Sequence, residues 1–431
     1  MPKKVFIRDL KPRMYVCSLD RPWSETPFLF QGFEITGEAE LSQLRQYCRY
    51  VYIAVDSDPH SAPRVRARDA PARPSAVVDK KAGHTPLLAL VEDTPTPARS
   101  RRVYQDYQDQ TTLDEEVEAI KQTHVQATAL VYEMLEDARL SRSFNTAGAK
   151  QVVAAMAESV LRNPDALVCF THLKRKDEYT AQHCLRVCIL GLAFGRHLGY
   201  DTDTLNALGI GCLMHDLGKM KVPLAILNKP GRLTEQEREI MKRHVPLGVA
   251  MLEDAKGFSP AAIEVARSHH ERYGGAGYIN HLKGGEIGEF GLIGAIVDTY
   301  DAITSDRVYH AGIATLTALG QMYEWRERDF EPMLMEQFIQ CMGVFPIGSV
   351  VRLNTGEIGV IRTRNRTRHL KPQVLVVLAP DHTPYATPKT IDLMYDTTSD
   401  ARPYTIKEVL ASGAHGINPM DYLPVAEGSD P

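Results

Sequence analysis

Three features are missing from this sequence, and each absence excludes a class of protein. No run of about 18 apolar residues occurs in the chain, so we expect no membrane span. The seven cysteines are scattered and contain no CxxC pair, which argues against a zinc ribbon and against a disulfide framework. Positive charge is not in excess, because 50 Lys and Arg face 54 Asp and Glu. With a net charge of −4 we expect no binding to long nucleic acid, although a local basic pocket stays open.

The start of the chain, MPKKVFIRDLKPRMY, also lacks an apolar stretch long enough for a signal peptide. Hydrophobic residues make up 44% of the chain and charged residues 24%, which is ordinary for globular proteins. A chain of 431 residues is long enough for two or three compact units. We therefore expect a cytoplasmic protein of more than one domain.

Composition and apolar periodicity divide the chain into four segments. Short apolar runs and turn residues in the first segment, with a helix expected at 38–48 and a strand at 50–55, indicate a small α+β module. The second segment is rich in Pro, Arg, Asp, Ala and Ser, so we expect a disordered linker. The third is helical in pattern almost throughout, and the fourth has the composition of a small β appendage with a hairpin turn at Asn354-Thr-Gly. The predicted boundaries are 1–56, 57–108, 109–342 and 343–431.

The long third segment makes the predicted fold class mainly α. An apolar stripe at three-to-four spacing runs from Leu113 to Met134, which favours core packing over a partner-binding face. Thr234 followed by Glu237 has the capping-box pattern and predicts a helix start. Further helices are expected at 146–162, 178–198, 203–215, 234–254, 259–271 and 289–304.

Histidines and aspartates gather in one window of the helical segment. A single histidine in an apolar helix is usually a core or surface residue, and an adjacent His-Asp or His-His pair indicates little more. Five histidines and two aspartates are different, because burying each polar group without a partner costs roughly a few kcal/mol and one metal site satisfies them together. Packed helices can direct such side chains at a shared point. The predicted ligands are His183, His215, Asp216, His244, His269, His270 and Asp298.

A ligand set of this size suits two ions rather than one. Imidazole and carboxylate without thiolate favour iron, manganese, cobalt, nickel or catalytic zinc over a structural zinc site, with iron or manganese the leading candidates. Two ions about 3.5–4 Å apart, bridged by an aspartate and sharing a hydroxide, form a clamp for in-line attack on phosphorus. Lys219, three residues after Asp216, can supply positive charge to phosphoryl oxygens. The predicted centre holds two divalent ions per chain, with Asp216 and Lys219 as catalytic residues.

Six motifs, in their order and spacing, resemble those of a known family. They are YTAQHCLRV, HDLGK, KRHVPLG, HHERYGGAGY, LKGGEI and VDTYDAITSDRVY. Their pattern is similar to the HD superfamily of metal phosphohydrolases, and in detail to its HD-GYP branch, bacterial phosphodiesterases that hydrolyse cyclic di-GMP. DLKPRMYV, LDRPW and TPFLFQGF resemble a small domain that often precedes HD-GYP domains, and SVVRLNTGEIGVI resembles a common C-terminal extension of the branch.

The resemblance assigns roles to individual residues. All seven predicted ligands match metal ligands of the family. The GYP signature maps to Gly277, Tyr278 and Ile279, with isoleucine in place of the usual proline. Arg307 matches a phosphate-contacting arginine, and His310 stands where the family often has Lys or Arg. The substrate-binding residues that the resemblance implies are Lys219, Gly277, Tyr278, Arg307 and His310.

The number of ions depends on the residue one helical turn before His183. Some members of the family hold a third ion with a glutamate at that position. Here the position is Tyr179, whose phenol has an ordinary pKa near 10 and is a poor ligand at neutral pH. Glu178 points about 100° away around the helix. We therefore expect two ions.

The leading hypothesis is a phosphodiesterase that hydrolyses cyclic di-GMP to pGpG, with further cleavage to GMP left open. A second hypothesis is a non-catalytic sensor that binds the cyclic dinucleotide and reports to a partner; the altered GYP loop favours it and the complete ligand set argues against it. A third is an HD hydrolase that acts on mononucleotides. Whether the chain binds a protein partner or a second copy of itself also stays open.

Overall fold

The computed structural model divides the chain into two compact units, Met1–Ala82 and Gly83–Pro431. The predicted linker, 57–108, falls outside the described residues except for Gln105, Tyr107 and Gln108. The described residues are 3–11, 14–19, 33–35, 38–53, 105, 107–171, 179–229, 231, 233–305, 313, 315–343, 345–365, 368, 370–410 and 413–424.

The first unit contains an antiparallel sheet with a helix packed on one face. Along β4, Val51 and Ile53 are buried while Tyr50 and Tyr52 are less so, the alternation of a strand with one covered face. The helix and β4 occur where the sequence predicts them. The sheet order is β1-β4-β2-β3. The elements are β1 (Lys3–Phe6), β2 (Tyr15–Leu19), β3 (Phe33–Glu34), α1 (Glu38–Tyr47) and β4 (Tyr50–Ile53).

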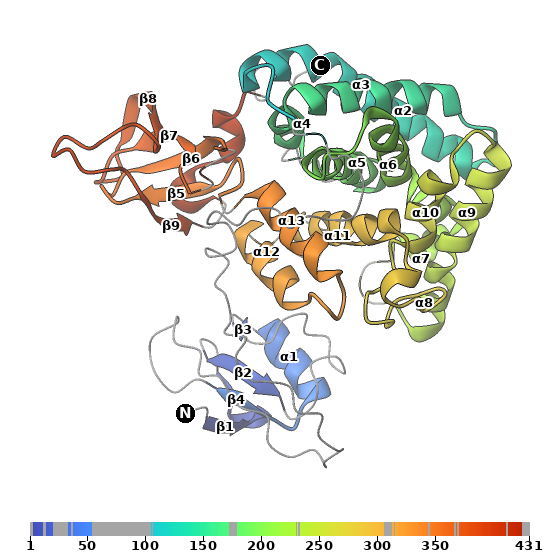
Figure 1. The fold of residues 1–431 in the computed structure, drawn as a ribbon. Coiled ribbons are helices and arrows are strands. Elements are labelled where there is room, and N and C mark those ends of the chain that lie inside the picture. Colours follow the sequence, from blue (N-terminus) through green and yellow to red (C-terminus); the bar gives the residue numbers. More distant parts are fainter. Residues whose placement is uncertain are drawn as a thin grey trace, which may run out of the picture. The chain divides into compact units, whose positions relative to one another are not determined.

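The second unit is mainly helical, which confirms the predicted fold class (Figure 1). The stripe from Leu113 to Met134 is buried in the core, as its spacing predicts. Among the described residues, no helix combines the length and the apolar character needed to cross a bilayer. The helices are α2 (Leu113–Arg139), α3 (Thr146–Arg162), α4 (Pro164–Phe170), α5 (Tyr179–His197), α6 (Thr202–Met214), the 3-10 helix η3 (Leu217–Lys221), α7 (Leu224–Leu227), α8 (Glu235–Lys242), α9 (His244–Ala255), α10 (Pro260–Ser268), α11 (Glu289–Thr304), α12 (Thr315–Glu324) and α13 (Pro332–Met342).

The single helix predicted over 234–254 is two helices in the structure. Thr234 forms the predicted capping box, but α8 ends at Lys242 and α9 begins at His244. Pro246 lies in the first turn of α9, where its missing N–H is tolerated, whereas inside a continuous helix its ring would clash with the carbonyl of Lys242. The break places His244 at the start of a helix.

Helices α5, α6, α10 and α11 pack against one another, and most of the predicted ligands lie on these helices or directly after them (Figure 1). The helix predicted over 259–271 ends earlier, at Ser268. Its last three predicted positions therefore follow the helix, and two of them, His269 and His270, turn toward α6 and α9.

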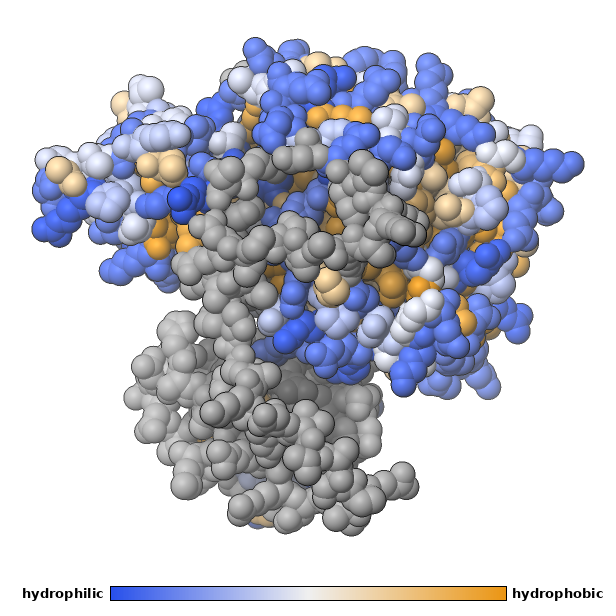
Figure 2. Space-filling model, viewed as in Figure 1, coloured by the Kyte–Doolittle hydropathy of each residue, from blue (hydrophilic) through white to orange (hydrophobic). Residues whose placement is uncertain are grey.

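The C-terminal region forms the predicted β appendage, an antiparallel sheet in the order β8-β7-β6-β5-β9. Asn354-Thr-Gly lies in the turn between β5 and β6, as predicted. Arg364 pairs with Asp165 of α4, and Arg362 pairs with Asp114 of α2 at 2.8 Å, so the sheet is tied to the helices. The described surface is mainly hydrophilic in the view of Figure 2. The strands are β5 (Val350–Leu353), β6 (Ile358–Thr363), β7 (Gln373–Leu378), β8 (Pro384–Asp392) and β9 (Ile406–Leu410).

Candidate metal centre

The predicted ligands come from separate helices and meet at one buried place. The pairs His215-Asp216 and His269-His270 each directly follow a helix, and His244 begins one. Short local turns therefore direct these side chains inward. In chain order the ligands lie on α5 (His183), after α6 (His215 and Asp216), at the start of α9 (His244), after α10 (His269 and His270) and in α11 (Asp298).

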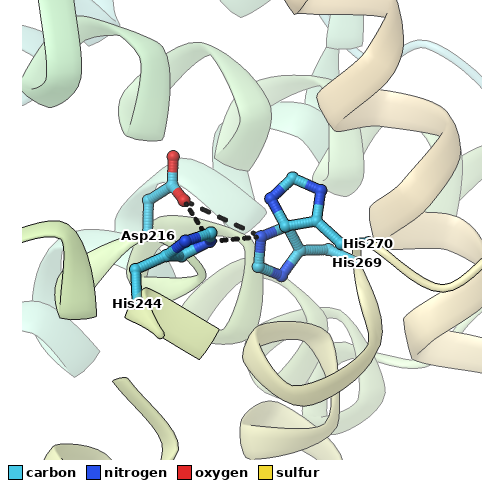
Figure 3. A group of neighbouring side chains, drawn as sticks. All are labelled: Asp216, His244, His269 and His270. Atoms are coloured by element: carbon cyan, nitrogen blue, oxygen red, sulfur yellow. Dashed lines mark hydrogen bonds and ion pairs between the residues drawn. The ribbon is translucent and has the colours of Figure 1, made fainter. Parts of the chain in front are cut away.

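Asp216, His244, His269 and His270 form one cluster, whose potential ligand atoms all lie within 4.8 Å of one another (Figure 3). The Oδ1 atom of Asp216 lies 3.5 Å from Nε2 of His244 and 3.7 Å from Nε2 of His269. The Nε2 atoms of His244 and His269 are 3.5 Å apart. The ring of His270 lies beside that of His269, with their centroids 4.0 Å apart.

His183, His215 and Asp216 form a second cluster, which Asp298 joins. The Oδ2 atom of Asp216 lies 3.2 Å from Nε2 of His215 and 3.5 Å from Nε2 of His183. Asp298 Oδ1 lies 3.1 Å from Nε2 of His183 and 3.8 Å from Nε2 of His215. The two Nε2 atoms face each other at 3.3 Å, as ligands that share an ion do.

Asp216 belongs to both clusters, and each of its oxygens faces a different one. Its Oδ1 is buried and has no hydrogen-bond partner, because the nearest imidazole nitrogens are at 3.5 and 3.7 Å. A buried carboxylate oxygen without a partner is costly unless a cation satisfies it. The donor set of imidazole nitrogens and carboxylate oxygens fits divalent transition metals. The residues therefore fit a metal-binding centre whose two clusters share Asp216.

Hydrogen bonds to Nδ1 orient the histidines so that Nε2 points into the centre. In three of them Nδ1 donates to a backbone carbonyl three or four residues earlier in the chain. Such bonds select the tautomer whose Nε2 is available to a metal. The acceptors are Cys212 O for His215 (2.7 Å), Met241 O for His244 (2.7 Å), and Val265 O and Ala266 O for His269 (both 3.1 Å).

His183 is oriented instead by a carboxylate, which the sequence reasoning missed. Its Nδ1 donates to Oδ2 of Asp301 at 2.7 Å, and Arg186 donates to both oxygens of Asp301. Burial would lower the pKa of His183, but hydrogen bonds to Asp298 and Asp301 raise it to about 9. Burial would raise the pKa of Asp301, but His183 and Arg186 lower it to about 2. The available signal was spacing, since Arg186 and Asp301 each lie three residues, about one helical turn, after a predicted ligand.

The carboxylates of the centre are held in their ionised form. Burial would raise the pKa of Asp216, but Lys219 and His215 hold it well below its usual range. Burial would also raise the pKa of Asp298, but the hydrogen bond from His183 holds it well below its usual range. Ionised carboxylates are the form that binds a cation.

The three histidines of the first cluster are held in their neutral form. Burial lowers the pKa of His244 to about 4 and also lowers the pKa of His269. Burial and the neighbouring His269 hold the pKa of His270 well below its usual value. Neutral imidazole is the form that binds a metal, so the cluster is prepared for one at neutral pH.

The other predicted site residues divide into those beside the centre and those outside the described residues. Lys219 lies beside it, with its ammonium paired to Oδ2 of Asp216 and its side chain 21% exposed. Arg307, His310 and the side chain of Tyr179 fall outside the described residues.

Gly277 and Tyr278 lie in a loop that follows the His269-His270 pair. Buried Glu271 organises the loop, because its two carboxylate oxygens accept the backbone N–H of Asn280 (2.8 Å) and of Leu282 (3.1 Å). A Cβ at Gly277 would lie 2.4 Å from Arg272 N, so this close passage of the chain requires glycine. Glu271 is a further residue for which the sequence reasoning assigned no role.

The same loop places an aromatic ring on the metal centre. The Tyr278 ring stacks on His270 with centroids 4.6 Å apart and planes 28° apart. Lys242 of α8 lies over the same ring, with Nζ 5.5 Å from its centroid. Tyr278 therefore forms part of the wall beside the first cluster.

Two family models match the chain. Residues 169–334 match the family described as HD domain, and residues 2–149 match a domain of unknown function, DUF3391.

Curated proteins provide three similar relatives. The chain is 34% identical over 378 residues to the cyclic di-GMP phosphodiesterase PA4108 of Pseudomonas aeruginosa, a match that covers 87% of this chain and 85% of the relative. It is 31% identical over 196 residues to the cyclic di-GMP phosphodiesterase response regulator RpfG of Xanthomonas campestris, covering 44% of this chain and 51% of that one. It is 32% identical over 169 residues to the 3′3′-cGAMP-specific phosphodiesterase 2 of Vibrio cholerae, a match that covers 39% of this chain and 32% of the relative.

The match to RpfG therefore spans about half of that relative and the match to the Vibrio protein about a third, whereas the match to PA4108 spans most of both chains. The HD-domain match contains every predicted ligand. This chain belongs to the HD-domain family of metal-dependent phosphohydrolases and is related to PA4108 over most of both chains.

Proposed function

We propose that the chain is a phosphodiesterase that hydrolyses cyclic di-GMP at this centre. The proposal is supported by two relatives named cyclic di-GMP phosphodiesterases, one of which matches 87% of the chain. It is also supported by the complete set of candidate ligands, of which all but His270 are buried. A sensor without catalytic function has no need of them, so the set disfavours that alternative.

The observation that carries the proposal is the placement of Asp216. One carboxylate serves both clusters, and its Oδ1 has no other partner. His244, His269 and His270 would hold one ion with Oδ1, and a second group would hold another with Oδ2. The residues of the second group are His183, His215 and Asp298.

Two divalent ions, iron or manganese, complete the proposed centre. When bound, they supply a nucleophile from water at neutral pH and stabilise negative charge on the phosphoryl oxygens. The chain's own part is to hold the ions close together, to keep the carboxylates ionised and the imidazoles oriented, and to place Lys219 beside the reacting phosphodiester. Lys219 is suited to this because its Nζ is next to the centre while its side chain still reaches the surface.

Recognition of the dinucleotide is assigned to residues around the centre. Lys219 and Tyr278 border it, and Gly277, Arg307 and His310 complete the proposed set. The Tyr278 ring offers an apolar face near the ligands. Aromatic faces accept nucleobases by stacking, so this residue suits a substrate that carries two bases.

A second cyclic dinucleotide, 3′3′-cGAMP, is a candidate substrate. A Vibrio cholerae relative named for that specificity is 32% identical over 39% of the chain. It covers less of the chain than PA4108 does, so cyclic di-GMP is the preferred assignment.

The test is Asp216→Ala in the full-length chain, loaded with manganese or iron and assayed on cyclic di-GMP, 3′3′-cGAMP and mononucleotides. We expect wild type to cleave cyclic di-GMP fastest and the variant to lose turnover together with bound metal, because both ions lose a ligand. Asp165→Asn is the matched control, since Asp165 is also buried and ion-paired but lies at the contact with the β sheet. Wild-type turnover by Asp216→Ala, or preferential cleavage of a mononucleotide by wild type, would contradict the proposal.

A further inference from the structure

We infer that Asp301, held in place by Arg186, is a positioning residue that orients His183 and thereby sets the affinity of one of the two ions. The inference rests on the metal centre of the proposed function. It concerns Asp301, which contacts a ligand without being one, and Arg186, which contacts Asp301.

The four histidines with an identified Nδ1 partner fall into two kinds. For His215, His244 and His269 the acceptor is a backbone carbonyl close by in the sequence. For His183 it is the side chain of Asp301, which is 118 residues away in the sequence. The orientation of His183 therefore depends on the packing of α5 against α11, whereas the others are oriented locally.

The position of each histidine in its helix explains the difference. The last carbonyls of a helix have no intrahelical partner and are free to accept from a side chain. The acceptors Cys212, Met241 and Ala266 lie in the last turns of α6, α8 and α10. His183 lies inside α5, where the neighbouring carbonyls are occupied by the helix itself. An acceptor for its Nδ1 must come from another element.

Asp301 is well placed for this role because all of its contacts converge on one orientation. Arg186 donates to Oδ1 at 2.6 Å and to Oδ2 at 3.0 Å, a two-point contact that sets the plane of the carboxylate. Ser305 Oγ adds a contact to Oδ1 at 3.3 Å. Both Asp301 and Arg186 are buried. Because a carboxylate only accepts, Nδ1 of His183 must carry the proton, which leaves Nε2 facing Asp298 and Asp216.

The effect should be confined to one ion. Asp301 contacts His183, which belongs to the second cluster, and no contact is found between Asp301 and His244, His269 or His270 among the described residues. Loss of a partner that orients a ligand typically weakens metal binding by about 10–100-fold. Asp301→Asn keeps the shape of the side chain but removes its charge. We expect it to weaken the ion at the second cluster by this factor and to leave the other ion bound.

The experiment measures metal binding by the full-length chain without substrate. Wild type, Asp301→Asn and Ser305→Ala are loaded with Mn²⁺ and equilibrated against a graded series of a chelator. Bound metal is counted by elemental analysis, and electron paramagnetic resonance distinguishes a coupled Mn²⁺ pair from a single ion. Asp165→Asn is the control, because it removes the charge of another buried aspartate paired with arginine. Ser305→Ala removes only the weaker contact to Asp301, so it covers the case in which Asp301→Asn does not fold.

The expected result is that wild type and Asp165→Asn release two ions together, while Asp301→Asn releases the first ion at roughly 10-fold or more lower chelator activity and shows an isolated Mn²⁺ signal. Ser305→Ala should shift the release of the same ion to a smaller extent. Unchanged release from both variants, or equal weakening of both ions, would overturn the inference. Because no substrate is present, a wild type that binds two ions but does not cleave cyclic di-GMP would refute the proposed function and leave this result valid.

Discussion

Lys219 is a charged side chain outside the ligand set that lies directly against the metal centre. It contacts Oδ2 of Asp216 from the adjacent 3-10 helix η3. A fixed positive charge near a phosphodiester stabilises the negative charge that develops in the transition state.

Replacement of Lys219 by methionine should reduce kcat by roughly 10²–10³-fold at saturating metal, because the positive charge is lost while the volume is kept. The number of bound ions should stay at the wild-type value. Lys221→Met is the matched control, since Lys221 lies in the same 3-10 helix but donates to Ser141 Oγ at 2.7 Å on an exposed surface. Steady-state kinetics measures kcat, and metal analysis counts the bound ions. A wild-type kcat in Lys219→Met would show that Lys219 is not a catalytic residue.

The loop departs from the family signature at Ile279, which stands in place of the usual proline. Ile279 is 36% exposed, whereas its neighbour Tyr278 stacks on His270. The loop is held by Glu271, which accepts the backbone N–H of Asn280 and Leu282, and by Tyr278 N–H, which donates to His270 O at 3.2 Å. The stack beside the centre therefore does not depend on the side chain at position 279.

At the scale of elements, the approach of η3 to α9 brings His244 to the centre. The two backbones touch at Gly218, where an added Cβ would lie 1.9 Å from His244 O and 2.5 Å from Gly248 N. Backbone atoms cannot rotate out of the way as side-chain atoms can. Any residue larger than glycine must therefore separate the two elements.

We expect Gly218→Ala to lower the free energy of unfolding by about 1–3 kcal/mol, as overpacking of a core typically does. It should also weaken the ion held by His244, because the displaced carbonyl belongs to that residue. Gly285→Ala serves as the control, since a Cβ there meets nothing within 4 Å. Urea unfolding and metal titration measure both effects; equal behaviour of the two variants would show that η3 and α9 do not need this contact.

The packing of α2 against α4 contains a histidine that destabilises the fold in acid. The His124 ring stacks on Phe170 with centroids 4.4 Å apart, and burial lowers the pKa of His124 from 6.5 to about 4. Between those two values the unfolded chain binds a proton that the folded chain does not. Stability is therefore complete above pH 6.5 and decreases as the pH falls toward 4.

The variant His124→Leu should lack this decrease. Relative to the variant, metal-free wild type should lose about 2 kcal/mol of unfolding free energy between pH 7 and pH 5, the value expected when the pKa lies about 2.5 units below its unfolded value. Urea unfolding of both metal-free proteins at the two pH values provides the measurement. Metal-free protein is used so that acid release of ions does not contribute. Parallel pH profiles would contradict the assignment.

At the scale of the whole molecule, the helical unit begins before its first long helix. Gln105 N–H donates to Gly199 O at 3.1 Å, and Tyr107 OH donates to Tyr200 O at 2.9 Å. Asp109 pairs with Arg196 at 2.8 Å. The first unit, Met1–Ala82, contains none of the predicted ligands.

A chain of residues 105–431 should therefore bind two ions and hydrolyse cyclic di-GMP as the full-length protein does. A shorter chain, 113–431, should keep the ligands but melt at a lower temperature, by about 2–4 °C for each kcal/mol of lost contact. Thermal unfolding, metal content and activity of the two chains test this. Loss of activity in a folded 105–431 chain would mean that the first unit contributes to the site.

The sequence by itself determined the chemical character of this protein. The HDLGK and HHE motifs and the spacing of the histidines were sufficient to predict the candidate ligands that the fold brings together, because ligand chemistry depends on residue type. Helix starts such as the capping box at Thr234 were also predictable, since they depend on hydrogen bonds within one turn. The break at Arg243 was readable in principle, because Pro246 is a local signal, yet the apolar periodicity across it favoured one helix.

Only the tertiary structure decided which atoms meet. Asp216 Oδ1 faces His244 and Oδ2 faces His183, a division that follows from how α5 packs against α6 and how η3 packs against α9. The Asp301–His183 hydrogen bond joins residues 118 positions apart, and no local pattern specifies that this aspartate orients that histidine. The physical reason is that residue type sets what a side chain can bind, whereas burial and the crossing of distant helices set the direction in which it points.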